Sequence, residues 1–540
     1  MSVINGRQDE AMKNRGRDAM APRNGRGREA AKSGKRGRNE NGRGMIRENM
    51  NGKKRGNGTV VAKRSREDES MRKKSNRQIL FVAYFMSALF LALGGYLSWY
   101  IVSESEERIN NPYNKRQEIL AEKVTRGSIY SDDGKVLAET KTKSNGDEYR
   151  YYPYGREFCH VVGRISNSMT GVEQSQCYPL LTSHGNPFEQ MAHSLKGEKK
   201  QGDSVYTTLN LGLQKAAYDA LGTHKGAVVA IEPKTGKILA MVSKPDYDPN
   251  TVDEDWDELI EDSEENSVLI NRCTQGVYPP GSTFKILTAL EYMRENPDTY
   301  KKYSYECDGR ASFGGNVIRC YGGEQHGSLN LSDAFTKSCN GAFADMGVQL
   351  SINSFRKLCE KFMFNKNLPV NFEYNKSSFR LTKDSDAAET AQTSIGQGKT
   401  TITPLQNAMI TAAIANDGIM MTPYVVDHTE NAAGKVVKQY EPKECSKAAS
   451  EEETKVIKKM MRAVVKKGTA SLLSSLSYGA AGKTGTAEID ADGTSHAWFV
   501  GYAPADNPKI VVSIVAEEAG TGGRYAVPIA DQMFREYLGD

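Results

Sequence analysis

The sequence predicts an α+β protein, in which an antiparallel sheet flanked by helices carries an inserted all-helical lobe. A small separate domain and one transmembrane helix are expected before it. Three observations predict this fold class. The chain has 540 residues, too many for one compact core. Strand patterns stand at both ends of residues 205–540 with helical patterns between them, and a charge-free run at 79–102 precedes this region.

Residues 1–78 form a basic tail, rich in Gly, Asn, Arg and Ser and almost free of aromatic residues. They contain 23 Lys and Arg residues against 9 Asp and Glu residues, a net charge of +14, which leaves −9 for the rest of the chain. Such a segment buries too little apolar surface to offset the entropy of ordering, so we expect disorder. Its Arg-Gly repeats would suit RNA, an anionic membrane surface or no specific partner. We favour a solvated tail, with no nucleic acid as primary partner.

Residues 79–102 are 24 residues without a charge, enough to span a hydrocarbon core of about 30 Å. The run is too long for the apolar core of a cleaved signal peptide, and the acidic stretch after it offers no small-residue cleavage site. Basic residues precede the run, namely Arg72, Lys73, Lys74 and Arg77. The positive-inside rule therefore predicts a single-pass protein of the cell membrane, with its N-terminus in the cytoplasm and everything after residue 102 outside.

Residues 103–204 are polar and mixed in pattern, and we expect a small non-catalytic domain there. The elements of residues 205–540 follow from periodicity and turn residues. We predict helices at 207–221 and 527–538, mainly helical chain from 282 to about 415, a β-hairpin at 226–232 and 237–242, an acidic loop and helix at 246–265, and strands at 479–488, 496–504 and 510–518. We expect the strands at both ends to form the sheet and the helices between them to form the lobe.

The segment Tyr278-Pro279-Pro280-Gly281 is followed by residues of good helical character. Proline and glycine end the preceding segment, which places Ser282 at the first turn of a helix. Lys285 follows on the same face, within reach of the serine hydroxyl. A serine becomes nucleophilic when a neighbouring base takes its proton, and burial lowers the pKa of a lysine enough for that role. An isolated Ser-x-x-Lys match is common by chance, however, and then means a capping serine with a solvated lysine.

Two further matches make chance improbable. Ser338-Cys339-Asn340 has the form Ser-x-Asn, and Lys483-Thr484-Gly485 has the form Lys-Thr-Gly. Ser-x-x-Lys, a Ser/Asn element and Lys-Thr-Gly, in this order, are the signature of penicillin-binding proteins and serine β-lactamases. Cys339 points away from the catalytic face if its neighbours point in, so we expect it to serve packing.

From about Arg126 to the C-terminus the chain resembles the class B penicillin-binding proteins, the monofunctional peptidoglycan D,D-transpeptidases (the penicillin-binding protein A and FtsI-like group). Four more segments carry the resemblance: Arg-Gly-Ser-Ile-Tyr at 126–130, Ser-Ile-Gly-Gln-Gly at 394–398, Thr-Pro-Leu-Gln at 403–406 and Trp-Phe-Val-Gly-Tyr at 498–502. The resemblance implies the penicillin-binding transpeptidase or serine β-lactamase-like fold. It also implies that residues 103–204 are a pedestal that positions the catalytic domain and contacts partners.

For the reaction, the resemblance implies acyl transfer through a covalent serine ester. Ser282 would attack the carbonyl of the penultimate D-alanine in a cell-wall stem peptide, with Lys285 as the base. Ser338, helped by Lys483, would relay the proton to the departing D-alanine, while Asn340 would hold Lys285 and the substrate amide. An amine from a neighbouring stem would then take the acyl group and form a cross-link. Penicillins imitate the D-alanyl-D-alanine end and would acylate the same serine.

Substrate binding is expected on the third motif. The resemblance implies that Thr484, Gly485 and Thr486 bind substrate, with the two threonine hydroxyls on the terminal carboxylate near the charge of Lys483. The backbone amides of Ser282 and Thr486 would form the oxyanion hole. The implied partners are stem peptides, β-lactams and a membrane glycosyltransferase of the SEDS type.

Two other kinds of function are open: hydrolysis of the acyl-enzyme, and sensing of β-lactams. A D,D-carboxypeptidase or a β-lactamase would hydrolyse the same ester; class A β-lactamases use a glutamate-held water, for which Glu389 is a candidate by position alone. The membrane helix and the pedestal argue against this reading. A β-lactam sensor would need more membrane helices and a cytoplasmic output domain, which one helix and a basic tail do not supply.

The eight cysteines include no Cys-x-x-Cys pair and the seven histidines form no ligand cluster in sequence, so we expect neither a structural zinc site nor another cofactor. Cys307 and Cys320 flank a Gly-rich turn and could face each other across a hairpin, while Cys159 and Cys177 are both in the predicted pedestal. Outside the membrane each pair could be a disulfide or two free thiols. We expect His326 to be structural rather than a base.

Overall fold

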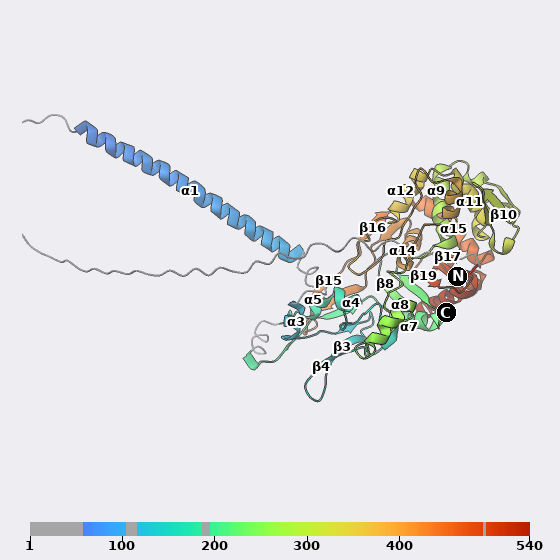
Figure 1. The fold of residues 1–540 in the computed structure, drawn as a ribbon, viewed down its shortest axis with the longest axis horizontal. Helices are drawn as coiled ribbons and strands as arrows, with labels where there is room; N and C mark the ends of the chain where they lie inside the picture. Colours follow the sequence, from blue (N-terminus) through green and yellow to red (C-terminus); the bar gives the residue numbers. More distant parts are fainter. Residues whose placement is uncertain (1–57, 104–115, 186–194, 490–492, 540) are drawn as a thin grey trace, which may run out of the picture. The chain divides into compact units, whose positions relative to one another are not determined.

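A computed structural model of the chain describes residues 58–103, 116–185, 195–489 and 493–539. Residues 1–92 and residues 93–540 separate into two units, which are described in turn. The main element of the first is α1 (Gly58–Ser103), drawn in blue in Figure 1, which continues a short way into the second. Within it, the stretch Asp68–Tyr100 reaches a mean hydropathy of 2.0 and is not buried, so by length and composition it can cross a membrane.

Residues 58–78 are helical, so our prediction of disorder is wrong for them; residues 1–57 lie outside the described part of the chain. Every side chain described between 63 and 78 is exposed, as the composition predicts. Lys, Arg and Glu are nevertheless good helix formers, and extending an existing helix needs no new nucleus. An ion pair between Lys73 Nζ and Glu69 Oε1, at 3.2 Å, adds a further stabilising contact one turn apart.

A five-stranded antiparallel sheet organises the second unit, with strand order β17-β18-β19-β7-β8. Its strands are β7 (Gly226–Ile231), β8 (Ile238–Lys244), β17 (Ala481–Glu488), β18 (Ser495–Ala503) and β19 (Ile510–Ala516). The predicted hairpin and the three predicted C-terminal strands are confirmed by their pairing. Because β17 lies at the edge, one side of the Lys-Thr-Gly motif is free of strand pairing.

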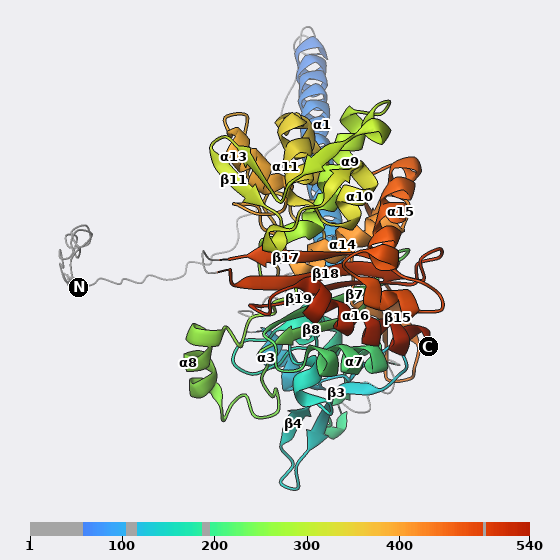
Figure 2. The same cartoon turned by 90° about the vertical axis from the view of Figure 1, so that its right-hand side faces the viewer.

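Helices cover both faces of this sheet (Figure 2). α7 (Leu211–Leu221) and α16 (Gly522–Leu538) pack on it and against each other, whereas α14 (Pro404–Ala415) lies on the other side. All residues of α14 are buried, as expected of a helix without a polar face. The helix predicted from residue 207 begins later, because residues 204–207 form a strand and Asn210 caps the helix.

A mainly helical lobe, yellow and orange in Figure 2, lies along the β17 side of the sheet. Its helices are α9 (Lys285–Glu295), α10 (Leu331–Thr336), α11 (Asn340–Gln349), α12 (Ile352–Lys361) and α13 (Ala387–Ser394). Two short strand pairs interrupt them: β9 (Tyr305–Cys307) with β12 (Gly327–Leu329), and β10 (Arg310–Phe313) with β11 (Asn316–Arg319). The remaining larger helices are α8 (Trp256–Asn266), inside the predicted acidic segment, and α15 (Glu451–Lys467).

A second, six-stranded sheet has the order β15-β14-β6-β2-β3-β4, and we call it the pedestal sheet. Its strands are β2 (Ile129–Tyr130), β3 (Val136–Thr142), β4 (Glu148–Tyr151), β6 (Ser204–Thr207), β14 (Val426–Glu430) and β15 (Val436–Gln439). Two of them therefore come from the C-terminal half of the chain. The division that we predicted at residue 204 falls at the start of β6, and residues 426–439 belong structurally with the earlier strands.

A buried ion cluster holds the pedestal together and explains the Arg-Gly pair at 126–127. The Glu173 carboxylate, fully buried, lies 2.6 Å from Arg126 Nε and 2.6 Å from Arg150 Nε. Burial alone would raise the pKa of Glu173, but the two guanidinium charges hold it below its ordinary value. At Gly127 a Cβ atom would lie 1.9 Å from Asp203 O, so only glycine fits.

Candidate active site

Ser282, the predicted nucleophile, lies on a 3₁₀ turn, η2 (Gly281–Phe284), which leads directly into α9. We expected an α-helical first turn; the two prolines before it favour this tighter start. Side chains three residues apart eclipse in a 3₁₀ turn, so Ser282 and Lys285 share one side of it. The structure records no hydrogen bond from the Ser282 hydroxyl to the amine.

Two hydrogen bonds fix the backbone on which the nucleophile sits. Trp498 Nε1, from the strand next to β17, donates to Pro279 O at 3.1 Å. Gly281 N donates to Gly396 O at 2.9 Å. A Cβ on Gly396 would lie 1.8 Å from Gly281 O, which shows why the Gly-Gln-Gly segment needs glycine here.

Both motif lysines are fully buried and meet at one hydroxyl. Lys285 Nζ donates to Asn340 Oδ1 and to Ser338 O, both at 2.7 Å, and to Ser338 Oγ at 3.3 Å. Lys483 Nζ donates to the same Ser338 Oγ at 2.8 Å and to Thr484 O at 3.0 Å. The three predicted motifs are thus joined by one hydrogen-bonded network.

The electrostatics of this network make both amines easier to deprotonate. Burial lowers the pKa of Lys285 to about 8. Burial and the neighbouring charge of Lys285 lower the pKa of Lys483 well below its ordinary value. Among the described residues neither lysine forms an ion pair with a carboxylate, so nothing restores the charged form as Glu173 does for the arginines.

The loop of the second motif has a strained conformation. Ser338 joins α10 to α11 with a φ of 57°, in the left-handed region that serine seldom adopts. Next to it, Cys339 caps α11 by accepting from Ala342 N at 3.4 Å. Asn340 Nδ2 donates to Arg319 O at 2.8 Å, which ties the loop to the end of β11. As predicted, Cys339 is directed away from the network, into the lobe.

The third motif presents backbone groups from the open edge of β17. Thr484 O accepts from Lys483 Nζ, and Thr486 O faces η2, since a Cβ on Gly281 would lie 2.9 Å from it. In a strand, the N–H and C=O groups of one residue point to the same side. The Thr486 N–H therefore points away from β18, toward Ser282.

A cleft of about 1240 Å³ brings the predicted residues together: it is lined by Ser282, Ser338, Asn340, Thr484, Gly485 and Thr486. Lys285 and Lys483 lie behind this lining. The sequence analysis missed the charged residues around the opening, which belong to no motif: Arg319, Glu324, Lys337, Glu488 and Arg524. Only their place in the fold, at the ends of separate elements, reveals them.

Glu389, the positional candidate for a deacylating base, is outside the cleft lining. Its side chain is 42% exposed and pairs with Lys399 Nζ at 2.9 Å. The structure gives it no contact with the network of the two buried lysines.

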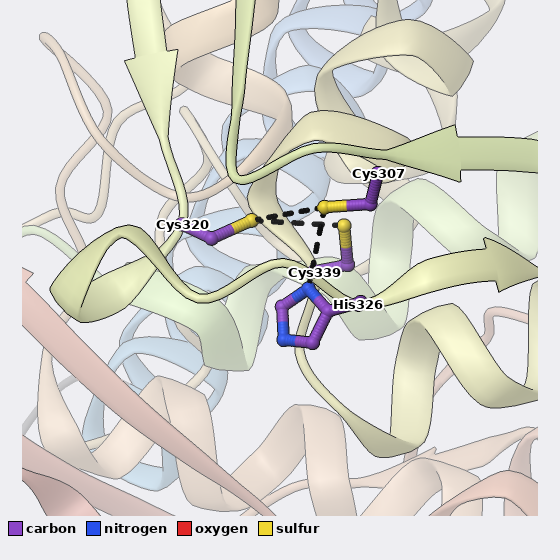
Figure 3. Close-up of side chains that lie close together, drawn as sticks. All are labelled: Cys307, Cys320, His326 and Cys339. Atoms are coloured by element: carbon purple, nitrogen blue, oxygen red, sulfur yellow. Dashed lines mark hydrogen bonds between the residues drawn. The ribbon is translucent and has the colours of Figure 1, made fainter.

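The cysteine pairs, for which the sequence left disulfides and free thiols open, are free thiols in the structure. All eight are free thiols, including Cys159 and Cys177 in the pedestal. Cys307, Cys320, Cys339 and His326 lie together (Figure 3), a grouping that the sequence analysis did not foresee. The local spacing gave no signal, because the four residues come from separate turns and strands.

The sheet, the helical lobe and a serine beside two buried lysines define a serine acyltransferase of the penicillin-recognising type. Residues 226–536 match the penicillin binding protein transpeptidase domain, and residues 126–205 match the penicillin binding protein A dimerisation domain. The chain belongs to the penicillin-binding protein transpeptidase family, and its resemblance to the class B members is confirmed.

Individual relatives match over most of their length. Peptidoglycan D,D-transpeptidase PbpA of Mycolicibacterium smegmatis is 31% identical over 447 residues, covering 78% of this chain and 90% of the relative. A penicillin G acyl-enzyme complex of penicillin-binding protein A from Mycobacterium tuberculosis has a TM-score of 0.70 and 30% identity, covering 77% of this chain and 99% of that one. The D,D-transpeptidase domain of a peptidoglycan glycosyltransferase from Eggerthella lenta has a TM-score of 0.68 and 31% identity, covering 76% and 98%.

Proposed function

We propose that this chain is a peptidoglycan D,D-transpeptidase that cross-links stem peptides through an ester on Ser282, and that β-lactams acylate the same serine. The observation that carries the proposal is a shared hydroxyl in the cleft. Ser338 Oγ receives hydrogen bonds from Lys285 and from Lys483, at 3.3 and 2.8 Å. A hydroxyl between two amines provides a path for a proton from the attacking oxygen to the leaving group.

In the first half of the reaction, neutral Lys285 takes the proton of Ser282 Oγ as this oxygen attacks the penultimate D-alanine carbonyl. A pKa of about 8 leaves an appreciable neutral fraction near pH 7. When the amine becomes an ammonium, Asn340 Oδ1 and Ser338 O already accept from it at 2.7 Å. These two contacts strengthen as positive charge develops, so they stabilise the transition state more than the ground state.

In the second half, the intermediate expels D-alanine, whose nitrogen receives a proton from Ser338 Oγ. The Lys285 ammonium, which donates to this oxygen, returns a proton to it. An amine of a neighbouring stem then attacks the ester carbonyl, and its proton returns along the same path to Ser282 Oγ. A β-lactam forms the same ester by opening its ring, but its nitrogen remains tethered. The tethered product stays in the cleft, which keeps out the acceptor amine.

Substrate is oriented by the third motif. The N–H groups of Ser282 and Thr486 would donate to the oxyanion. The hydroxyls of Thr484 and Thr486 would bind the terminal carboxylate. Gly485 between them lets the strand pack closely, because a Cβ there would lie 2.9 Å from the Cβ of Trp498. Around the opening the basic side chains of Arg319, Lys337 and Arg524 outnumber two glutamates, and this excess suits an anionic peptide.

We also propose the arrangement in the cell: a basic cytoplasmic tail, a single span at about 79–102, and the pedestal and transpeptidase domain outside. A long apolar helix preceded by Arg72, Lys73, Lys74 and Arg77 supports this orientation. A membrane glycosyltransferase of the SEDS type is the proposed partner, since strands must be polymerised before they are cross-linked.

The nucleophile is tested with Ser282→Ala in the full chain, incubated with a fluorescent penicillin. We expect no covalent label, with unchanged thermal unfolding. Ser475→Ala, a change of an exposed serine outside the cleft, is the matched control and should label as the unsubstituted chain does. Labelling of Ser282→Ala at the same rate would show that another residue is the nucleophile.

Transfer is distinguished from hydrolysis by the fate of the ester. We expect the penicillin adduct to last for minutes or longer after free drug is removed, whereas a β-lactamase, with turnover of about 1–1000 per second, would clear it at once. Intact-mass spectra over time measure this. A stem peptide with an added D-amino acid then separates the two remaining reactions: exchange of the terminal residue supports transfer, and release alone would support a carboxypeptidase.

Orientation is tested with protease added outside spheroplasts. The part after residue 102 should be digested and the tail spared. A protected C-terminal part would reverse the proposed topology.

A further inference from the structure

A second cavity, of about 240 Å³, lies where the pedestal meets the transpeptidase domain. Its walls come mainly from residues 160–175 of the pedestal and residues 269–275 of the transpeptidase domain, and none of its lining residues lines the catalytic cleft. We call it the junction cavity. One water takes about 30 Å³ of the liquid, so the volume suits a ligand of amino-acid or dipeptide size.

One wall of the junction cavity carries a buried positive charge. Arg164 is 4% exposed and forms no ion pair with any described carboxylate. Its Nη1 donates to Tyr247 Oη at 2.9 Å and its Nη2 to Asn167 O at 3.2 Å. Its buried Nε has no acceptor in the part of the chain that the structure describes. A guanidinium has five N–H groups and keeps its charge, so this side chain has donors left for an anion.

Aromatic rings account for part of this charge. The guanidinium carbon of Arg164 lies 5.1 Å from the ring centroid of Tyr247 and 5.3 Å from that of Trp256. A ring face attracts a cation, but the N–H groups of a guanidinium lie in its plane and need acceptors of their own. A carboxylate meets that need, because its two oxygens match the fork of the guanidinium.

Two further buried side chains in the lining have unused hydrogen-bonding atoms. His160 is 7% exposed, and burial lowers its pKa to about 4, so the ring is neutral near pH 7. Its Nε2 lies 3.1 Å from Pro245 O and therefore carries the proton, which leaves Nδ1 as an acceptor. The hydroxyl of Thr274, a residue that is 2% exposed, has no hydrogen-bond partner among the described residues. These walls suit a ligand with both donors and acceptors.

A negative charge also belongs to the lining. Glu373 is exposed, and its Oε2 accepts from Gln275 Nε2 at 3.3 Å. No described lysine or arginine forms an ion pair with this carboxylate, Arg164 included. The cavity therefore has a cationic wall and a separate anionic group. A ligand that carries a carboxylate and an ammonium complements both.

We propose that the junction cavity binds a small zwitterion, an amino acid or a dipeptide, with its carboxylate on Arg164 and its ammonium directed to Glu373. His160 Nδ1 and Thr274 Oγ1 would bind polar atoms between these two ends. Binding is non-covalent and independent of the reaction at Ser282. D-Alanyl compounds from the cell wall and peptides of L-amino acids share this chemistry, and the two sources are separated by the choice of probe.

Such a ligand would join two parts of the molecule. His160 and Arg164 belong to the pedestal, whereas Thr274 lies in the segment that leads to the nucleophile, eight residues before Ser282. This segment is fixed to the transpeptidase domain, since Thr274 O accepts from Asn375 N at 2.9 Å. A ligand that contacts both sides of the junction binds the folded chain alone, so it should raise the temperature of unfolding.

Binding is measured by calorimetry on the full chain in detergent, after penicillin has acylated Ser282 and so occupies the cleft. The probes are D-alanine, D-alanyl-D-alanine and L-alanyl-L-alanine. We expect one saturable site per chain, and the probe that binds most tightly identifies the source. The unfolding temperature of the same sample should rise with the concentration of that probe.

Substitutions in the lining locate the site. Arg164→Gln should weaken binding by about tenfold or more, because the carboxylate loses its charged partner. Thr274→Val keeps the shape of the side chain without its hydroxyl and should weaken binding severalfold. Glu452→Gln changes an exposed glutamate on α15, outside the cavity, and should leave the affinity unchanged.

A matched ligand tests the ammonium end. Propionyl-alanine is the alanine dipeptide without its amino group, and it should bind the unsubstituted chain severalfold more weakly than the dipeptide. Glu373→Gln, a change of an exposed residue, should remove this difference. Equal affinities of the two ligands for the unsubstituted chain would reject the zwitterion as the ligand.

Three other results would overturn the site. The first is no saturable binding of any probe, as expected if the cavity holds water only. The second is binding that penicillin abolishes, which would place the probe in the cleft. The third is unchanged affinity in the lining variants; if Arg164→Gln does not fold, Thr274→Val and Glu373→Gln decide. A chain that penicillin fails to acylate would count against the proposed function and not against this site, because the comparison of variants needs no acylation.

Discussion

The molecule buries two clusters of positive charge, and it treats them in opposite ways. In the pedestal, Arg126 and Arg150 are both held by the carboxylate of Glu173. In the cleft, Lys285 and Lys483 share the neutral hydroxyl of Ser338. The first cluster keeps its charges by pairing them. In the second, burial without a carboxylate lowers the lysine pKa values, so the amines lose their protons more readily.

The difference shows that a buried basic side chain serves structure in one cluster and reactivity in the other. A guanidinium loses its proton at no ordinary pH, so pairing it serves geometry. An amine can lose its proton, and leaving it unpaired turns it into a base. Reactivity and stability should therefore respond separately to changes in the two clusters.

The largest expected effect is on reactivity. Lys285→Met removes the base while keeping an unbranched side chain, and we expect penicillin acylation to slow by about 10²–10⁴-fold. Unfolding should change little, since loss of a buried cation offsets loss of its hydrogen bonds. Stopped-flow labelling and thermal unfolding measure the two quantities. Lys399→Met, at an exposed lysine of the same lobe, is the control; a similar slowing there would remove the distinction.

Stability is the matching test in the pedestal. Glu173→Gln leaves two buried guanidinium groups with one neutral partner, and we expect unfolding to become easier by about 3–5 kcal/mol. Acylation of the folded fraction should keep its rate constant within about twofold. Glu148→Gln breaks a surface pair, Lys199 Nζ to Glu148 Oε2 at 2.8 Å, and should change stability by about 1 kcal/mol or less. Equal losses in the two variants would contradict the comparison.

The pH dependence separates the clusters further. The neutral form of Lys285 is the base, so acylation should rise about tenfold per pH unit below its pKa of about 8 and level off above it. The pKa of Glu173 is lowered in the folded chain, so its stabilisation is present above the ordinary carboxylate pKa and is lost as the pH falls through the lowered value. Acylation rates measured from pH 6 to 10 and unfolding measured below pH 5 test these two dependences. An acylation rate that is flat between pH 6 and 8 would remove Lys285 as the base.

The smallest effect is expected where charge is exposed. Glu389→Gln breaks the pair with Lys399 outside the cleft, and it should alter neither adduct lifetime nor stability measurably. Intact-mass decay of the penicillin adduct is the measurement. A much longer-lived adduct in this variant would restore Glu389 as a hydrolytic base.

Much of the core could be predicted because its signals are local. The hairpin β7–β8 has two apolar runs around a Pro-Lys-Thr-Gly turn, and β18 and β19 are further apolar runs close together in sequence. The catalytic residues could also be predicted, because each lies in a short motif. Their hydrogen-bonded network could not be predicted, since the bond from Lys483 to Ser338 depends on how a strand edge meets a helical loop.

The missed features are those made by distant segments. No pattern near Val426 indicates that β14 pairs with β6, and the helix predicted from 207 ignored the strand that this pairing creates. The grouping of Cys307, Cys320, His326 and Cys339 gave no signal in the sequence, because cysteine patterns are recognised by short spacing. The helix over 58–78 was missed for another reason. The composition of these residues indicates only that their side chains stay exposed, and an exposed stretch can still continue an adjoining helix.

The pedestal sheet has a consequence for the order in which the protein is made. β6 ends at Thr207, and its neighbour on one side, β14, begins at Val426, with the whole helical lobe between them. A chain synthesised from its N-terminus therefore presents β6 with an unpaired edge while the nucleophile and the second motif are still being added. Such an edge invites wrong partners. A chain that stops before residue 426 therefore has neither a complete pedestal sheet nor a complete cleft.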